Sequence, residues 1–192
     1  MISDGAKLIV GLGNPGFIYA GSRHNIGFKV LKSLASSLKI NFKRDSSVSS
    51  LVVKSKLLQQ DVVLALPQTY MNLSGIAVVA LLKKFKVDLK DLLVVCDDLD
   101  LELGKIKIRP QGSSGGQRGL ESIIERLESR EFCRLRIGIG RPRSSQDAAK
   151  YVLEGFLRKE KAVVKQIEED AVNGCVSWIE NGITKTMNVF NK

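Results

Sequence analysis

The sequence predicts an α/β fold, in which a single three-layer domain over 1–192 has a central mixed β-sheet flanked by helices. Short apolar runs typical of buried strands alternate with segments of helical periodicity along the chain. Two strand-like segments within 48–67 and an alternating segment at 104–110 argue against an all-parallel sheet. No internal repeat, low-complexity segment or linker divides the sequence, so one domain is expected.

The first strand is predicted at 7–13, KLIVGLG, which is short, rich in β-branched residues and closed by glycine. Residues 26–38 are expected to form a helix, because their apolar side chains recur on one helical face. Two strands, 49–57 and 61–67, follow with a polar turn at 59–61 between them.

The next helix is predicted at 72–86, with Asn72 as a candidate N-cap. A flexible glycine-rich loop at 111–119 then leads into a helix at 119–129. The remaining strands are expected at 91–98, 104–110 and 132–142.

The last third of the chain, 145–180, is helical in pattern. Gly155 interrupts this pattern, so we expect two helices that are broken near this residue.

The charge balance is strongly basic. Thirty Lys and Arg against twenty Asp and Glu give a formal net charge of +10. The segment 105–143 carries ten basic residues and four glutamates, whereas 88–102 holds six acids and one lysine. A polyanionic partner such as nucleic acid is one interpretation, and a solvated lysine-rich surface is the other. Charge alone leaves both open.

The composition is that of a soluble globular protein, with 44% apolar and 26% charged residues. No apolar run approaches the roughly 18 residues of a membrane span. The N-terminus lacks the features of a signal peptide, so a cytoplasmic protein without membrane contact is expected. Cys96, Cys133 and Cys175 are odd in number and far apart, which favours reduced thiols. With one histidine, no metal site is expected.

GLGNPG at 11–16 matches the dinucleotide-binding fingerprint G-x-G-x-x-G and follows a strand. Its context does not fit, because no helical segment follows Gly16 and no acid follows about 20 residues on to bind a ribose hydroxyl. No nucleotide cofactor is therefore expected. The turn still lies where open α/β sheets bind ligands, with Asn14 held by Pro15 as an amide donor.

His24 is the only histidine in the chain, and a lone histidine is more often structural than catalytic. Asn72 has a structural interpretation as a helix cap, and Asp97 or Asp98 as a strand end. We expect these residues to share one sheet edge with Asn14. An aspartate on one ring nitrogen makes the other nitrogen a better base, and amides can stabilise an oxyanion. Such a set suits the hydrolysis of an ester by water.

Six motifs occur in the order and spacing that resemble the bacterial peptidyl-tRNA hydrolase family, and they run through essentially the whole chain. They are KLIVGLGNPG (7–16), YAGSRHNIGF (19–28), TYMNLSG (69–75), DDLDLELG (97–104), GGQRGL (115–120) and RLRIGIGRP (134–142). The resemblance implies cleavage of the ester between a peptide and the terminal ribose of tRNA, with no metal or cofactor. The implied partner is peptidyl-tRNA, bound at its acceptor stem and 3′ end.

The resemblance also implies roles for particular residues. His24 would accept the proton of the attacking water, and Asp97 would orient His24. Asn14 would help to separate peptidyl-tRNA from free aminoacyl-tRNA. The implied contacts to the peptide and the acceptor end come from Asn72, Tyr19, Tyr70 and Met71, and those to tRNA phosphate from Arg109 and Arg136. Small size and no evident dimer motif favour a monomer.

The loop at 115–119 departs from the family pattern. It reads G-G-Q-R-G where the family has G-G-H-N-G. The family's asparagine contacts the substrate and is thought to help place the attacking water. Arg118 cannot accept a hydrogen bond, so it cannot copy that role fully. It can still donate to an oxyanion or bind a phosphate.

An RNA-binding relative without catalysis, like the splicing members of this superfamily, is the alternative function. Asn14, His24, Asn72 and Asp97 occur together and favour the enzyme, because phosphate binding requires none of them. Arg118 is the feature that favours the alternative.

Overall fold

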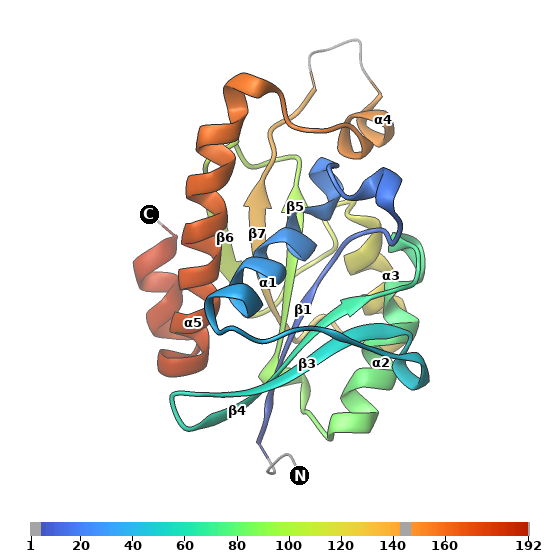
Figure 1. Ribbon diagram of the computed structural model, residues 1–192, viewed down its shortest axis with the longest axis vertical. Helices are drawn as coiled ribbons and strands as arrows, with labels where there is room; N and C mark the ends of the chain where they lie inside the picture. The colour runs from blue at the N-terminus through green and yellow to red at the C-terminus, as the bar shows by residue number, and fades with distance from the viewer. Residues whose placement is uncertain (1–4, 143–146, 192) are drawn as a thin grey trace.

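A mixed seven-stranded sheet in the order β2-β3-β4-β1-β5-β7-β6 forms the centre of the protein (Figure 1). A computed structural model describes residues 5–142 and 147–191. The strands are β1 (Lys7–Gly11), β2 (Lys43–Asp45), β3 (Ser50–Leu57), β4 (Gln60–Pro67), β5 (Leu92–Asp98), β6 (Ile106–Arg109) and β7 (Cys133–Gly138). β1 pairs in parallel with β4 and β5, and β5 with β7, while β2–β3, β3–β4 and β6–β7 are antiparallel. The predicted mixed sheet is thus confirmed.

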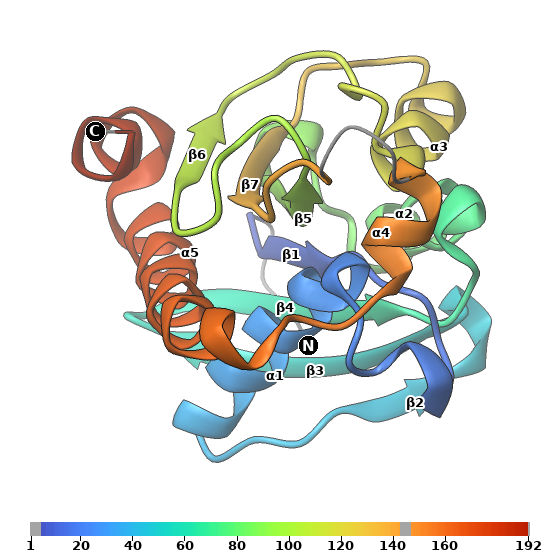
Figure 2. The ribbon, with the colours of Figure 1, turned by 90° about the horizontal axis from the view of Figure 1, so that it is seen from above.

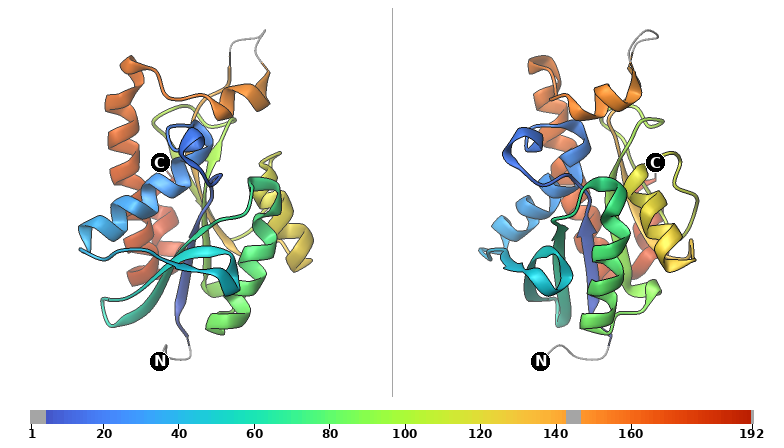
Figure 3. Two further views of the ribbon diagram at one scale, coloured as in Figure 1. Left: turned by 45° about the vertical axis from the view of Figure 1, so that its right-hand side comes forward. Right: turned by 90° about the vertical axis from the view of Figure 1, so that its right-hand side faces the viewer.

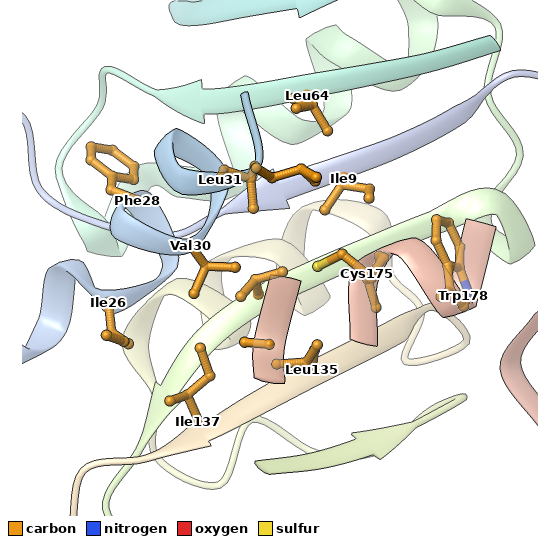
Figure 4. Close-up of a cluster of buried hydrophobic side chains, with 14 of the residues drawn as sticks. Ile9, Ile26, Phe28, Val30, Leu31, Leu64, Leu135, Ile137, Cys175 and Trp178 are labelled. Carbon is orange, nitrogen blue, oxygen red and sulfur yellow. The ribbon is translucent and has the colours of Figure 1, made fainter. Parts of the chain in front are cut away.

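Helices cover both faces of the sheet, as Figure 3 shows. The helices are α1 (Ile26–Ser37), α2 (Ser74–Phe85), α3 (Arg118–Leu127), α4 (Ala148–Leu153) and α5 (Lys161–Phe190). One apolar cluster lies between the sheet and α1 and α5 and includes Ile9, Leu31 and Trp178 (Figure 4). The other lies under α2 and α3 and includes Leu8 and Val10. Neighbouring β1 residues therefore face opposite clusters, which explains its continuous apolar run.

The start of α1 lies directly against the backbone of the central strands. A Cβ on Gly27 would lie 2.4 Å from the Val95 carbonyl oxygen and 2.6 Å from the Leu12 nitrogen. Likewise, a Cβ on Gly11 would lie 2.4 Å from the Gly27 carbonyl oxygen. Only residues without a side chain allow this approach. It brings the turn that precedes α1 to the carboxyl ends of β1 and β5.

The helical C-terminal third is broken near Gly155 as predicted, because α4 ends at Leu153 and α5 begins at Lys161. The predicted positions 145–146 lie outside the described residues. A second break at Gly182, with φ 73° and ψ 178°, was not predicted, and α5 continues beyond the predicted end at 180.

Two local predictions are wrong. Asn72 does not cap α2, because it lies inside the short 3₁₀ turn Met71–Leu73, and Leu73 occupies the N-cap position. The turn between β3 and β4 lies one residue earlier than expected, at Leu58 and Gln59, which both have positive φ.

We expect Gly27→Ala to lower the free energy of unfolding by about 1–3 kcal/mol, because the added methyl group overlaps backbone atoms of Val95 in β5 and of Leu12, which follows β1. Urea denaturation measures this change. Gly21→Ala is the matched control, since a Cβ there meets nothing within 4 Å. Equal stability of the two variants would contradict the close approach of α1 to the sheet.

Candidate active site

A cavity of about 530 Å³ opens at the carboxyl edge of the sheet. In Figure 1 the arrows of β1, β5 and β7 point towards this end of the molecule, and Figure 2 looks onto it, with α4 close to the viewer. Eight of the predicted site residues line the cavity: Asn14, His24, Tyr70, Met71, Asn72, Asp97, Arg118 and Arg136. Tyr19, on the 3₁₀ turn Phe17–Tyr19, and Arg109, on β6, lie outside its lining.

His24 and Asp97 form a buried pair in the lining of the cavity. The Nδ1 of His24 lies 2.8 Å from Oδ2 of Asp97, and the two residues are 8% and 3% exposed. An ionised carboxylate can only accept a hydrogen bond, so Nδ1–H is the donor. The lone pair of the neutral imidazole is then on Nε2, where it can accept a proton from a water molecule.

Asn14 is held by hydrogen bonds on three of its groups. Its Oδ1 accepts the backbone N–H of Met71 at 2.8 Å, which leaves the side-chain NH₂ as a donor. The side chain of Asn25 accepts the backbone N–H of Asn14 at 2.8 Å and donates to its carbonyl at 2.9 Å. Sequence reasoning missed Asn25. In the sequence, only the position of Asn25 directly after His24 indicates a role in the site.

Gln117 holds the second oxygen of Asp97 and was also missed. Its Nε2 donates to Oδ1 of Asp97 at 3.0 Å. Its Oε1 accepts the backbone N–H of Leu120 at 2.8 Å, so Gln117 is the N-cap of α3. In the sequence, a polar residue where a glycine-rich loop meets a helix is the feature that could have indicated this N-cap.

The cavity rim carries two arginines. Arg136 on β7 forms an ion pair through Nε with the carboxylate of Asp98. The two consecutive aspartates of β5 therefore have different partners. Asp97 is hydrogen-bonded to His24, and Asp98 forms an ion pair with Arg136. Lys107 lies directly opposite Arg136 in the β6–β7 ladder, so two cations share this face of the sheet. Arg118 is exposed at the first residue of α3.

Arg23, the neighbour of His24, connects the 3₁₀ turn Arg23–Asn25 to α4 and to the segment between α4 and α5. Its buried guanidinium lies 2.8 Å from the carboxylate of Glu160 and packs over the rings of Tyr151 and Phe156, at 4.4 and 4.7 Å from their centroids. Its backbone N–H donates to the carbonyl of Glu154 at 2.9 Å. Because α4 forms one wall of the cavity, Arg23 fixes that wall relative to His24.

The three cysteines are buried and free, as expected for reduced thiols. Burial raises the pKa of the Cys175 thiol to about 12 and also raises the pKa of Cys96 and Cys133, so all three are poor nucleophiles. Within residues 5–142 and 147–191, no cluster of three or more His, Cys, Asp or Glu side chains is placed to hold a metal ion. Nor does that part of the chain contain a helix that is long and apolar enough to cross a membrane.

Comparison with known proteins places these features in a family. A family model described as peptidyl-tRNA hydrolase matches residues 8–192. The chain is 41% identical to the peptidyl-tRNA hydrolase of Desulfitobacterium hafniense, covering 97% of this chain and 100% of the relative. It is 44% identical to that of Aquifex aeolicus, over 97% and 96% of the two chains. The crystal structure of peptidyl-tRNA hydrolase from Acinetobacter baumannii superimposes with a TM-score of 0.91 at 34% identity, covering 100% of this chain and 96% of that one.

Proposed function

The chain belongs to the peptidyl-tRNA hydrolase family, and from that premise we propose that His24, oriented by Asp97, carries out the hydrolysis of peptidyl-tRNA. The observation that supports this assignment most strongly is the 2.8 Å contact between Nδ1 of His24 and Oδ2 of Asp97 beside a cavity. The bond to be broken is the ester between the peptide and the terminal ribose of tRNA.

The reaction begins with a water molecule on Nε2 of His24. As the water oxygen attacks the ester carbonyl, its proton passes to Nε2, and Asp97 stabilises the resulting imidazolium. The carbonyl oxygen becomes an oxyanion, to which the NH₂ group of Asn72 donates. The tetrahedral intermediate then collapses. The ribose oxygen leaves with the proton from His24, which gives a free tRNA hydroxyl and a peptide carboxylic acid that ionises in water.

Asn14 supplies selectivity for a blocked amino group. Its Oδ1 is occupied by Met71, so its NH₂ group faces the substrate as a donor. An N-blocked residue offers a carbonyl oxygen that can accept this hydrogen bond, whereas a free α-ammonium group offers only donors. Tyr70 and Met71, which line the same cavity, contact the peptide.

The basic rim binds the tRNA backbone. The ion pair with Asp98 uses Nε of Arg136, so its terminal nitrogens remain for a phosphate of the acceptor stem. Lys107 and Arg109 extend this positive surface along β6, and Arg118 adds a cation next to the reacting ester. Recognition of this kind follows the shape of an RNA end rather than its sequence.

The proposed mechanism takes its base, orienting carboxylate and amide donors from this chain, and it uses no metal or cofactor. We place the protein in the cytoplasm as a monomer. Its buried free thiols are typical of a reducing compartment, and its substrate is a product of translation.

The RNA-binding alternative without catalysis is not favoured. Phosphate binding requires neither the buried His24–Asp97 pair nor the hydrogen bonds that fix Asn14. Arg118, which favours it, also fits the enzyme as a donor to phosphate.

We expect His24→Ala to slow the release of an N-acetylated amino acid from tRNA by about 10²–10⁴-fold, because the variant lacks the proton acceptor. Radiolabelled product release measures the rate. Filter binding is the control and should show unchanged affinity for tRNA. If the wild type binds tRNA but releases nothing faster than buffer, the proposed function is wrong and the RNA-binding alternative holds.

We expect Arg136→Ala to weaken tRNA binding and to reduce the slope of log K against log salt by about one, because one phosphate contact is lost. Hydrolysis of a minimal aminoacyl-nucleotide ester should stay close to the wild-type rate. Because Arg136→Ala leaves Asp98 without its ion-pair partner, the double variant Arg136→Ala/Asp98→Asn serves as the control for misfolding. Equal loss on both substrates in the double variant would contradict a role in phosphate binding.

A further inference from the structure

The carboxylate of Asp97 is 3% exposed and receives one side-chain hydrogen bond on each oxygen. Nδ1 of His24 donates to Oδ2 at 2.8 Å, and Nε2 of Gln117 donates to Oδ1 at 3.0 Å. A buried carboxylate with a donor on only one oxygen would be costly and free to turn about its χ2 torsion. The two donors together hold the carboxylate in one orientation.

The orientation of the Gln117 amide follows from the helix that it caps. Its Oε1 accepts the N–H of Leu120 at 2.8 Å, and a backbone N–H can only donate. The NH₂ end must therefore point the other way, towards Asp97 and the sulfur of Met71. A reversed amide would leave the helix N–H without an acceptor and place a carbonyl oxygen against the carboxylate.

The backbone around Gln117 is also fixed. Gly115 and Gly116 have φ of 57° and 79°, a conformation that favours glycine. A Cβ on Gly119 would lie 2.5 Å from the sulfur of Met71 and 2.8 Å from Cδ1 of Leu12. The first turn of α3 is therefore packed tightly against the cavity, which holds Gln117 within reach of Asp97.

We propose that Gln117 is a positioning residue of this enzyme, whose side-chain amide fixes Asp97 and through it the imidazole of His24. The inference deepens the proposed function and rests on it. Gln117 acts through Asp97, and it also joins the first turn of α3, which carries Arg118, to Asp97 and His24.

The test separates the cap from the contact with Asp97. Gln117→Ser keeps a strong N-cap, but its side chain is too short to reach Asp97. Gln117→Met has nearly the original length and provides neither a cap nor an N–H donor. Gln117→Asn is a second short cap, for use if the serine variant does not fold.

Two readouts follow these variants. The first is kcat for the release of N-acetylated amino acid from tRNA. The second is the proton NMR signal of the Nδ1–H of His24 without substrate, which can be assigned because His24 is the only histidine in the chain. The other charged groups near the pair are the same in every variant: Asp98, Arg136, Arg118 and Asp147.

In Gln117→Ser we expect kcat to fall by about tenfold or more, which is typical for the loss of one hydrogen bond to a charged group. The Nδ1–H signal of His24 should shift, because Asp97 loses one donor and accepts the hydrogen bond from Nδ1–H more strongly. Thermal stability should fall further in Gln117→Met than in Gln117→Ser, because the methionine variant lacks the cap as well as the donor to Asp97. A wild-type kcat and a wild-type Nδ1–H signal in Gln117→Ser would overturn the proposal and leave Gln117 as a helix cap. Failure of the proposed function is seen separately, as a wild-type protein that releases nothing.

Discussion

The contact between His24 and Asp97 is the interaction on which the rest of the site depends. It joins residues 73 positions apart, one on the turn before α1 and one at the end of β5. The contact is possible because Gly11 and Gly27 let α1 lie against the central strands. Asn25 and Arg23 then extend from the same turn, towards the β1 loop and towards the α4–α5 segment. One short stretch of chain thus carries His24, holds the backbone of Asn14 and fixes a wall of the cavity.

Most elements of the fold could be predicted because they are encoded locally. The edge strand β2 was not predicted, because its three polar residues show no apolar pattern. The apolar run of β1 and the one-sided helix α1 are readable from spacing alone. Asn72 shows the limit, since an asparagine before a helix is an N-cap in many proteins, whereas here a 3₁₀ turn intervenes. The roles of Asn25 and Gln117 could not be predicted in this way. Their hydrogen bonds join residues 11 and 20 positions apart and exist only once β1, α1 and α3 have packed.

The charge pattern has a structural explanation that composition did not reveal. The acidic stretch 88–102 contains β5, and the basic stretch 105–143 contains β6 and β7. The two stretches run side by side because β5 is the neighbour of β7 in the sheet. The partners across this boundary are Arg136 with Asp98, Arg141 with Asp100 and Lys105 with Glu102. Some of the basic residues are therefore held in place by ion pairs with these acids, and Arg136 at the cavity is one of them. An arginine that is held by an ion pair through Nε presents its terminal nitrogens to phosphate in a fixed direction.

In the proposed mechanism, His24 acts as a neutral base with its proton on Nδ1 and is directed by Asp97. The most direct test is the ¹⁵N spectrum of the single imidazole in the free protein, at a pH where the ring is neutral. The two ring nitrogens have distinct shifts according to which one carries the proton. The structure predicts a protonated Nδ1 and an unprotonated Nε2. A ring that carries its proton mainly on Nε2 would contradict the account.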